Sequence, residues 1–244
     1  MLIYGKNAVS EALEQGQAQR VMVALGVRES TVRDIEKLAR RAQVPVDRVP
    51  RIDLDQALKT TSHQGVVAEL PDLDYSAEEA PFELAASRGE KLLLVLLDQV
   101  QDPRNYGAII RSSEVLGAHG VVTEERRSAP LSAVVAKTAA GATAHLPLVQ
   151  VKNLARFIDD LKSRNVWIYG ADAGSRTTPE MIDWDRDAAL VMGSEGTGLR
   201  RLVREKCDEI VGIPTSGRVS SLNASVAAGI MLYAVQAGRS KGDR

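Results

Sequence analysis

An uninterrupted run of apolar residues near the middle of the chain constrains the fold more than any other feature. Residues Leu92 to Leu97 are six consecutive apolar residues, and Asp98 ends the run. Such a run is typical of a β-strand buried on both faces, as in parallel sheets covered by helices. Further predicted strands alternate with predicted helices: the strands are 119–123, 147–151, 166–170, 188–192 and 209–213, and the helices are 106–116, 132–140, 154–164, 199–206 and 221–236. This order predicts an α/β fold with a mainly parallel sheet.

Charge divides the 244-residue chain into three parts. Residues 61–90 contain one basic residue against seven acidic ones, and they include Pro71 and Pro81. We therefore interpret residues 71–89 as an acidic linker between two domains. Residues 1–70 alternate short strands and helices and predict a small α/β sandwich, whereas residues 90–244 contain the parallel sheet. We expect the final residues, 238–244, to form a frayed polar tail.

The overall composition limits the possible functions. Hydrophobic residues make up 44% of the chain and charged residues 26%, as in ordinary globular proteins. The formal net charge of -1 argues against nucleic-acid binding through bulk charge, although the chain outside residues 61–90 is positive. One cysteine and three scattered histidines predict neither a disulfide nor a metal site. The apolar runs are too short to cross a membrane and the N-terminus resembles no signal peptide, so we expect a soluble cytoplasmic protein without a membrane partner.

Three polar or glycine-rich segments follow predicted buried strands, at the position where open α/β sheets bind ligands. In the first, residues 98–111, Asn105 either caps a helix or offers its side chain to a ligand, and Arg111 lies further along that helix. In the second, residues 191–199, Gly193, Gly196 and Gly198 either form a tight turn or let the backbone approach a ligand closely. Glu195 in this segment disfavours a phosphate ligand, because its carboxylate would repel the phosphate charge.

The third segment, residues 213–229, leads from a strand into a helix rich in small residues. Ser221 and Asn223 lie where this helix begins. They either cap a core helix or contribute polar groups to a site. The small residues that follow would let another backbone pack closely against the helix.

In this order and with these spacings, the three segments resemble the three motifs of the SpoU (TrmH-type) RNA 2′-O-ribose methyltransferases of the SPOUT superfamily. The resemblance covers about residues 92–237. Residues 3–9 and 62–68 are similar to the ends of the small RNA-binding domain, itself similar to certain ribosomal proteins, in the RlmB-like branch of that family. Arg104 and Tyr106 depart from the family pattern, which often has His and Leu at these positions.

This resemblance implies a fold, a cofactor and a substrate. The implied catalytic domain is a deep trefoil knot that binds S-adenosylmethionine and forms a homodimer, with the helix of the third segment near the interface. By position, the cofactor contacts fall at Gly193, Gly198, Ile213 and Leu222. The RlmB-like branch methylates a guanosine in the peptidyltransferase region of 23S rRNA, which makes that RNA the expected partner.

The resemblance also implies the catalytic residues, which are Asn105, Arg111, Glu195, Ser221 and Asn223. The proposed base of the family matches Arg111, although a guanidinium does not normally lose its proton. We favour electrostatic stabilisation by Arg111 with shared proton removal, and Glu195 is an alternative base. Other arginines and lysines could line an RNA path: Arg126, Arg127, Lys137, Arg200, Arg201, Arg204 and Arg218.

Three other functions remain open from the sequence. The first is tRNA 2′-O-methylation, which the additional N-terminal domain disfavours. The second is an antibiotic-resistance rRNA methyltransferase with a similar two-domain layout. The third is a non-catalytic RNA-binding factor in ribosome assembly, which the intact set of Asn105, Arg111, Glu195 and Asn223 argues against.

Overall fold

The computed structural model describes residues 1–70, 73–217 and 221–242, and the chain divides into two compact units, Met1–Leu73 and Asp74–Arg244. The first unit contains β1 (Leu2–Tyr4), α1 (Lys6–Glu14), β2 (Arg20–Ala24), α2 (Glu29–Ala42), β3 (Val46–Val49), α3 (Arg51–Leu58) and β4 (Val66–Glu69). Its sheet has the order β1-β4-β2-β3, in which β4 is antiparallel to both of its neighbours.

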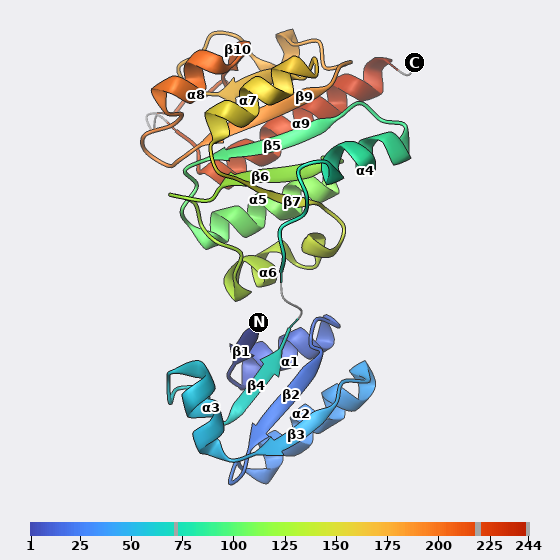
Figure 1. Cartoon of the computed structure of the whole chain (residues 1–244), viewed down its shortest axis with the longest axis vertical. Coiled ribbons are helices and arrows are strands. Elements are labelled where there is room, and N and C mark those ends of the chain that lie inside the picture. Colours follow the sequence, from blue (N-terminus) through green and yellow to red (C-terminus); the bar gives the residue numbers. More distant parts are fainter. Residues whose placement is uncertain (71–72, 218–220, 243–244) are drawn as a thin grey trace. The chain divides into compact units, whose positions relative to one another are not determined.

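Successive side chains along the strands of the first unit point to opposite faces of the sheet, which explains the layers of this unit. Val21 and Val23 of β2 face the apolar sides of α1 and α2, where they pack with Val9 and Ile35. Met22, which lies between them, belongs to the opposite face and packs with Leu54 of α3. The unit is therefore a sheet with helices on both faces (Figure 1), as the alternating pattern of residues 1–70 predicts.

The second unit contains a six-stranded parallel sheet in the order β10-β8-β9-β5-β6-β7. The strands are β5 (Leu93–Asp98), β6 (Gly120–Glu124), β7 (Leu148–Val151), β8 (Trp167–Ala171), β9 (Ala188–Gly193) and β10 (Glu209–Val211). The helices are α4 (Ala80–Arg88), α5 (Pro103–Val115), α6 (Ala133–Ala139), α7 (Leu154–Ser163), α8 (Arg201–Lys206) and α9 (Ala224–Gly242). Two short 3₁₀ turns, η1 (Ala142–Ala144) and η2 (Pro179–Met181), complete the unit.

The apolar run around β5 lies inside the sheet and is buried on both faces, as predicted. Leu93, Val95 and Leu97 pack against residues of α5 and α9 on one face. Leu94 and Leu96 pack against residues of α7 and α8 on the other face. Figure 1 shows these helices on opposite sides of the sheet, so the predicted α/β fold with a parallel sheet is confirmed.

The predicted linker at residues 71–89 needs correction. Residues from Asp74 onward belong to the second unit, and residues 80–88 form α4. Ala85 of this helix is buried, and Ser76 N–H donates to Leu148 O over 2.6 Å. Charge and prolines suggested a linker, but Pro81 lies in the first turn of α4, where the missing N–H costs no hydrogen bond.

The predicted tail at residues 238–244 is also largely wrong, because α9 continues to Gly242. Arg239 explains the extension. Its guanidinium donates to the carbonyl oxygens of Lys91, Leu92, Trp184 and Arg186 over 2.7–3.2 Å. These bonds fix the end of α9 to the segments that directly precede β5 and β9. Residues 243–244 lie outside the described part.

Within the described residues, no helix combines the length and the apolar character that a bilayer crossing needs.

Candidate functional site

The carboxyl ends of β5 and β9 bring the first two polar segments together. The two strands are parallel neighbours, and Asp98 at the end of β5 is in register with Gly193 at the end of β9. The loop of residues 99–102 and the loop of residues 194–198 therefore start side by side. The third segment reaches the same edge, because Asn223 at the start of α9 contacts both of the others.

Asn105 lies inside the first turn of α5 and is not its cap, so the capping interpretation is wrong. The cap is Asp102, whose carboxylate accepts from Arg104 N–H over 2.9 Å, and Pro103 follows it at the first helical position. The side chain of Asn105 therefore does not cap the helix and is available for other contacts. Its side chain is buried and turns toward the other two segments.

Asn105, Glu195 and Asn223 form one hydrogen-bonded cluster. The Asn105 amide donates to Glu195 Oε1 over 2.7 Å, and the Asn223 amide donates to the same oxygen. Asn223 also donates to Asn105 Oδ1 over 3.0 Å. Two amide donors hold one carboxylate oxygen of an otherwise exposed Glu195, so this side chain is fixed in position and still accessible to a ligand.

Asn223 also caps α9. Its Oδ1 accepts from Ser225 N–H over 2.9 Å and from Val226 N–H over 3.3 Å. The side chain thus uses its oxygen for the helix and its amide group for the cluster. The helix-cap interpretation of the third segment is confirmed for Asn223, and its role as a site residue stays a prediction.

The glycines of the second segment make a tight loop. Ser194 N–H donates to Gly198 O over 3.2 Å, and Gly198 N–H donates to Ser194 O over 3.0 Å. Gly196 and Gly198 have φ values of 89° and 66°, in the left-handed region that favours glycine. A Cβ atom on Gly193 would lie 2.3 Å from the carbonyl carbon of Gly198, so only glycine allows this close approach.

The remaining predicted catalytic residues lie outside the cluster. Arg111 is exposed on α5, and among the described residues it has no hydrogen-bond or ion-pair partner. Ser221 is also exposed, and no described residue links it to Glu195. Arg111 can therefore meet an anionic ligand without first breaking an ion pair.

The predicted cofactor residues are distributed along this edge. Gly193 and Gly198 bound the tight loop at the end of β9. Ile213, which follows β10, is half-buried against the core, whereas Leu222 is exposed just before α9. A cavity of about 320 Å³ opens between the loops, with a lining that includes Val100, Asn105, Glu195, Thr197 and Ala224.

A buried ion-pair network lies next to the 194–198 loop, and the sequence analysis did not predict it. Asp98 is fully buried; its carboxylate accepts from Arg200 N–H over 2.7 Å and from Arg200 Nε over 2.5 Å. Arg200 Nη2 also lies 3.1 Å from Glu124 Oε2. The other oxygen of Glu124 accepts from Leu154 N–H at the start of α7. The network ties Arg200, the second residue after the 194–198 loop, to the ends of β5 and β6.

A signal for this network exists in the sequence. Asp98 and Glu124 each end a buried strand with a carboxylate, and such carboxylates need a cationic partner. Arg200 forms ion pairs with both of them, so its charge serves the fold, and its place on an RNA path stays a prediction.

Other arginines of the predicted RNA path are also paired. Arg204 pairs with Asp172, and Arg201 lies 3.4 Å from Glu205. Arg126 and Arg127 are exposed, Lys137 lies in the last turn of α6, and Arg218 lies outside the described residues.

Across the part of the chain that the structure describes, no group of three or more His, Cys, Asp or Glu side chains could hold a metal ion.

Comparisons with known proteins match both units. The model of the SpoU rRNA Methylase family matches residues 92–233, and the model described as RNA 2′-O ribose methyltransferase substrate binding matches residues 2–76. A Bacillus subtilis (strain 168) protein, YacO, is named as a member of the TrmH family of tRNA/rRNA methyltransferases. It is 40% identical over 237 residues, which are 96% of this chain and 94% of YacO. A protein of Mycobacterium avium (strain 104), named as a tRNA/rRNA methyltransferase, is 43% identical over 94% of this chain and 75% of its own length.

Two solved structures are informative. The SpoU methyltransferase AviRb from Streptomyces viridochromogenes, in complex with AdoMet, has a TM-score of 0.70 and 27% identity, and the match covers 99% of this chain and 91% of AviRb. The TrmH/SpoU tRNA modifying enzyme of A. aeolicus has a TM-score of 0.57 and 27% identity, but that match covers 63% of this chain and 78% of the enzyme.

Proposed function

Because the chain belongs to the SpoU rRNA methylase family, we propose that it transfers a methyl group from S-adenosylmethionine to a ribose 2′-hydroxyl of RNA. One structural observation carries this proposal. Asn105, Glu195 and Asn223 come from three segments far apart in the sequence, and they meet at the carboxyl edge of the sheet beside a cavity. Such an edge is the usual ligand site of an open α/β sheet.

The residues at this edge fit S-adenosylmethionine, which supplies an electrophilic methyl group on a sulfonium cation. The glycine loop has no side chain at Gly196 or Gly198, where a Cβ atom would meet no other residue, so its backbone can lie directly against a ligand. The carboxylate of Glu195 suits a cationic ligand and disfavours a phosphate. Val100 adds an apolar side chain to the cavity lining, and Leu222 is exposed next to Asn223. The trefoil knot in this region stays a prediction from the family resemblance.

The chain's own residues have distinct roles in the proposed reaction. Glu195, held by two amides, can accept a hydrogen bond or a proton from the ribose hydroxyl. Arg111 has no competing carboxylate among the described residues and can bind a substrate phosphate, where it would stabilise the developing negative charge. Asn105 and Asn223 are positioning residues, because they act through Glu195.

We propose a guanosine in the peptidyltransferase region of 23S rRNA as the target, and the cytoplasm as the place of the reaction. The first unit supports an RNA substrate, because its family model describes substrate binding by RNA 2′-O ribose methyltransferases. The match to the A. aeolicus tRNA modifying enzyme covers 63% of the chain, whereas the match to AviRb covers 99%. The shorter match leaves part of this chain without a counterpart in the tRNA modifying enzyme, which disfavours tRNA as the substrate.

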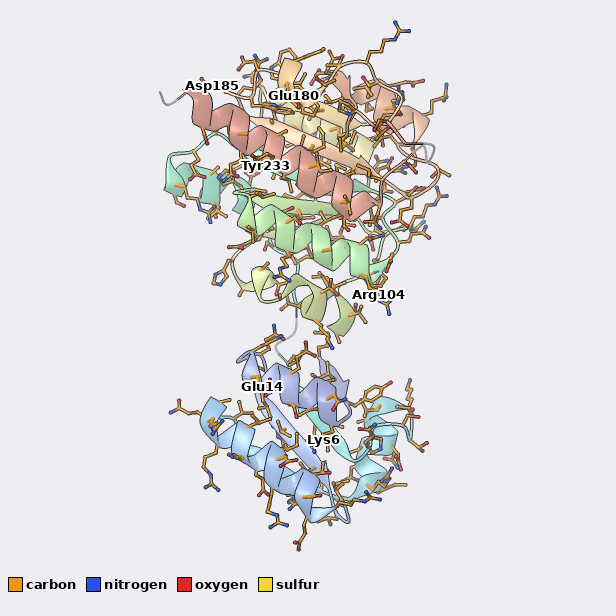
Figure 2. The ribbon with its side chains drawn as sticks, turned by 180° about the vertical axis from the view of Figure 1, so that it is seen from behind. Lys6, Glu14, Arg104, Glu180, Asp185 and Tyr233 are labelled. Atoms are coloured by element: carbon orange, nitrogen blue, oxygen red, sulfur yellow. The ribbon has the colours of Figure 1, made fainter. Side chains whose placement is uncertain are left out.

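We also propose a homodimer through α9. Val226, Ile230 and Tyr233 are 48%, 39% and 63% exposed. Their spacing of four and three residues places them on one side of the helix. Figure 2 shows Tyr233 on the outer side of α9. An exposed apolar stripe of this kind is typical of a protein interface.

Calorimetry and methyl transfer test the proposal. We expect S-adenosylmethionine to bind the purified chain, and tritiated methyl groups to enter 23S rRNA but not tRNA. Glu195→Gln should lower turnover by about 10²–10⁴-fold if the carboxylate takes the proton. Ser240→Ala, a change near the end of α9 and away from the cluster, is the control. Absence of binding at millimolar cofactor would overturn the methyltransferase proposal.

Arg111→Lys and Arg111→Ala test the arginine separately. Loss of turnover in both variants would support a specific guanidinium role. Near-wild-type turnover of the lysine variant across the pH range would show that any cation suffices at this position.

A further inference from the structure

The outer side of α2 in the first unit carries a concentration of positive charge. Arg33, Lys37, Arg40 and Arg41, which we call the α2 basic face, are all exposed. The opposite side of the helix buries Val32, Ile35 and Ala39 in the core of the unit. At 3.6 residues per turn, the two sets lie on opposite sides of the helix. Figure 2 shows long side chains projecting from this helix away from the sheet.

The acidic residues of α2 do not neutralise this face. Each of its three carboxylates already has a cationic partner. Asp34 lies 2.7 Å from Lys6 Nζ, Glu36 lies 3.5 Å from Arg48 Nη2, and Glu29 lies 3.9 Å from Arg33 Nη2. Lys37, Arg40 and Arg41 have no carboxylate within ion-pair distance among the described residues. Three cations thus remain available to an external anion.

The shape of the face suits an extended anion rather than a single ion. Arg33, Lys37 and Arg41 repeat every four residues, which places them about 6 Å apart along the helix axis. Together with Glu36 and Arg40 they line a shallow hollow of about 400 Å³. A row of cations along a groove matches a row of phosphates along a nucleic-acid strand.

We infer that the α2 basic face binds the phosphate backbone of the RNA substrate. The inference rests on the proposed function, which makes RNA the substrate, and it names the surface by which the first unit holds that RNA. An anionic membrane is a poorer partner, because membrane-bound basic helices place apolar side chains in the lipid, and the apolar side of α2 is buried in its own core.

Paired variants of the full chain test this inference. Lys37→Gln/Arg41→Gln removes two charges from the α2 basic face, and glutamine keeps the helix propensity high. Arg51→Gln/Lys59→Gln removes two exposed charges at α3, on the other face of the same sheet. The probes are a transcript of the peptidyltransferase region of 23S rRNA and anionic phospholipid vesicles.

We expect the α2 variant to bind the transcript about tenfold more weakly and the α3 variant to bind within about twofold of wild type. The slope of log affinity against log salt should fall by about 1.4–1.8 in the α2 variant only, the value for two lost phosphate contacts. Equal affinities and slopes for both variants would overturn the inference. So would a loss of vesicle binding with unchanged RNA binding.

S-adenosylmethionine calorimetry on the same samples keeps this result separate from the proposed function. If both variants and the wild type bind the cofactor but share the same RNA affinity, only the α2 surface is wrong. If the wild type binds neither cofactor nor RNA, the methyltransferase proposal fails as well.

Discussion

The carboxylate of Asp98 is fully buried, and Arg200 compensates its charge. A buried charge that loses its partner remains uncompensated, which typically costs about 3–5 kcal/mol. Arg200 is partly exposed, so water can replace some of the lost interaction.

We therefore predict that Arg200→Ala lowers the free energy of unfolding by about 2–3 kcal/mol, somewhat less than for a fully buried pair. Arg201→Ala is the control, because it breaks only an exposed pair with Glu205 and should cost less than about 1 kcal/mol. Urea unfolding measures both. Equal costs would show that the Asp98–Arg200 contact does not stabilise the fold.

Gly193 is a second residue whose replacement we expect to have a large effect, because even one added methyl group does not fit there. In Gly193→Ala, the new methyl group overlaps the backbone of Gly198, so the 194–198 loop must move. Overpacking of this kind costs about 1–3 kcal/mol, and we expect S-adenosylmethionine to bind about 5–150-fold more weakly.

Gly229→Ala is the matched control for this prediction. A Cβ atom at Gly229 would meet only Ser112 Oγ, at 3.8 Å, and alanine favours a helix. Calorimetry should find its cofactor affinity unchanged. Unchanged affinity in Gly193→Ala as well would exclude the glycine loop from the cofactor site.

At the scale of elements, His119 joins the beginnings of two strands. Its Nδ1 accepts from Leu93 N–H over 3.0 Å, and its Nε2 lies 3.0 Å from Glu90 Oε2. Burial lowers the pKa of His119, and the neighbouring Glu90 carboxylate opposes this shift only in part. The folded protein therefore favours the neutral imidazole.

The sign of the pH effect follows from this shift. As the pH falls below about 6.5, the unfolded chain takes up a proton at His119 more readily than the folded chain, so the free energy of unfolding decreases. We expect this decrease between pH 7.5 and 5.5 to be smaller in His119→Asn, which cannot titrate but keeps an acceptor for Leu93 N–H. Chemical unfolding at the two pH values measures it. An equal decrease in both proteins would contradict the assignment to His119.

At the scale of the whole molecule, the α9 stripe predicts association. Ile230→Lys/Tyr233→Lys should shift sedimentation from dimer to monomer at micromolar concentration, because two charges would lose water in the interface. Met181→Lys/Leu202→Lys changes two other exposed apolar side chains and should leave the dimer intact. A monomeric wild type, or a dimeric α9 variant, would contradict the proposed interface.

The charge of the whole chain is a poor guide to its surfaces. The net charge of -1 averages the acidic stretch 61–90 with the α2 basic face. From the total charge alone we expect a shallower salt dependence than for a strongly basic RNA-binding protein. The phosphate contacts of the α2 basic face would add to this salt dependence, although the net charge of the chain does not reveal them.

Local patterns determine much of this protein. The apolar run of residues 92–97 and the alternation after it predict the parallel sheet, because burial on both faces requires continuous apolar residues. The resemblance of their three segments to the SpoU motifs predicts Asn105, Glu195 and Asn223 as site residues. Their types and positions are properties of the sequence itself.

Only the tertiary structure decided which of these residues meet. Asn105 and Asn223 are 118 positions apart and still share a hydrogen bond, because the order of strands in the sheet is not their order in the chain. The same packing pairs Arg200 with Asp98 and turns part of an acidic stretch into α4. Periodicity reports which side of an element is buried, whereas the partner of a buried polar group depends on which elements become neighbours in space.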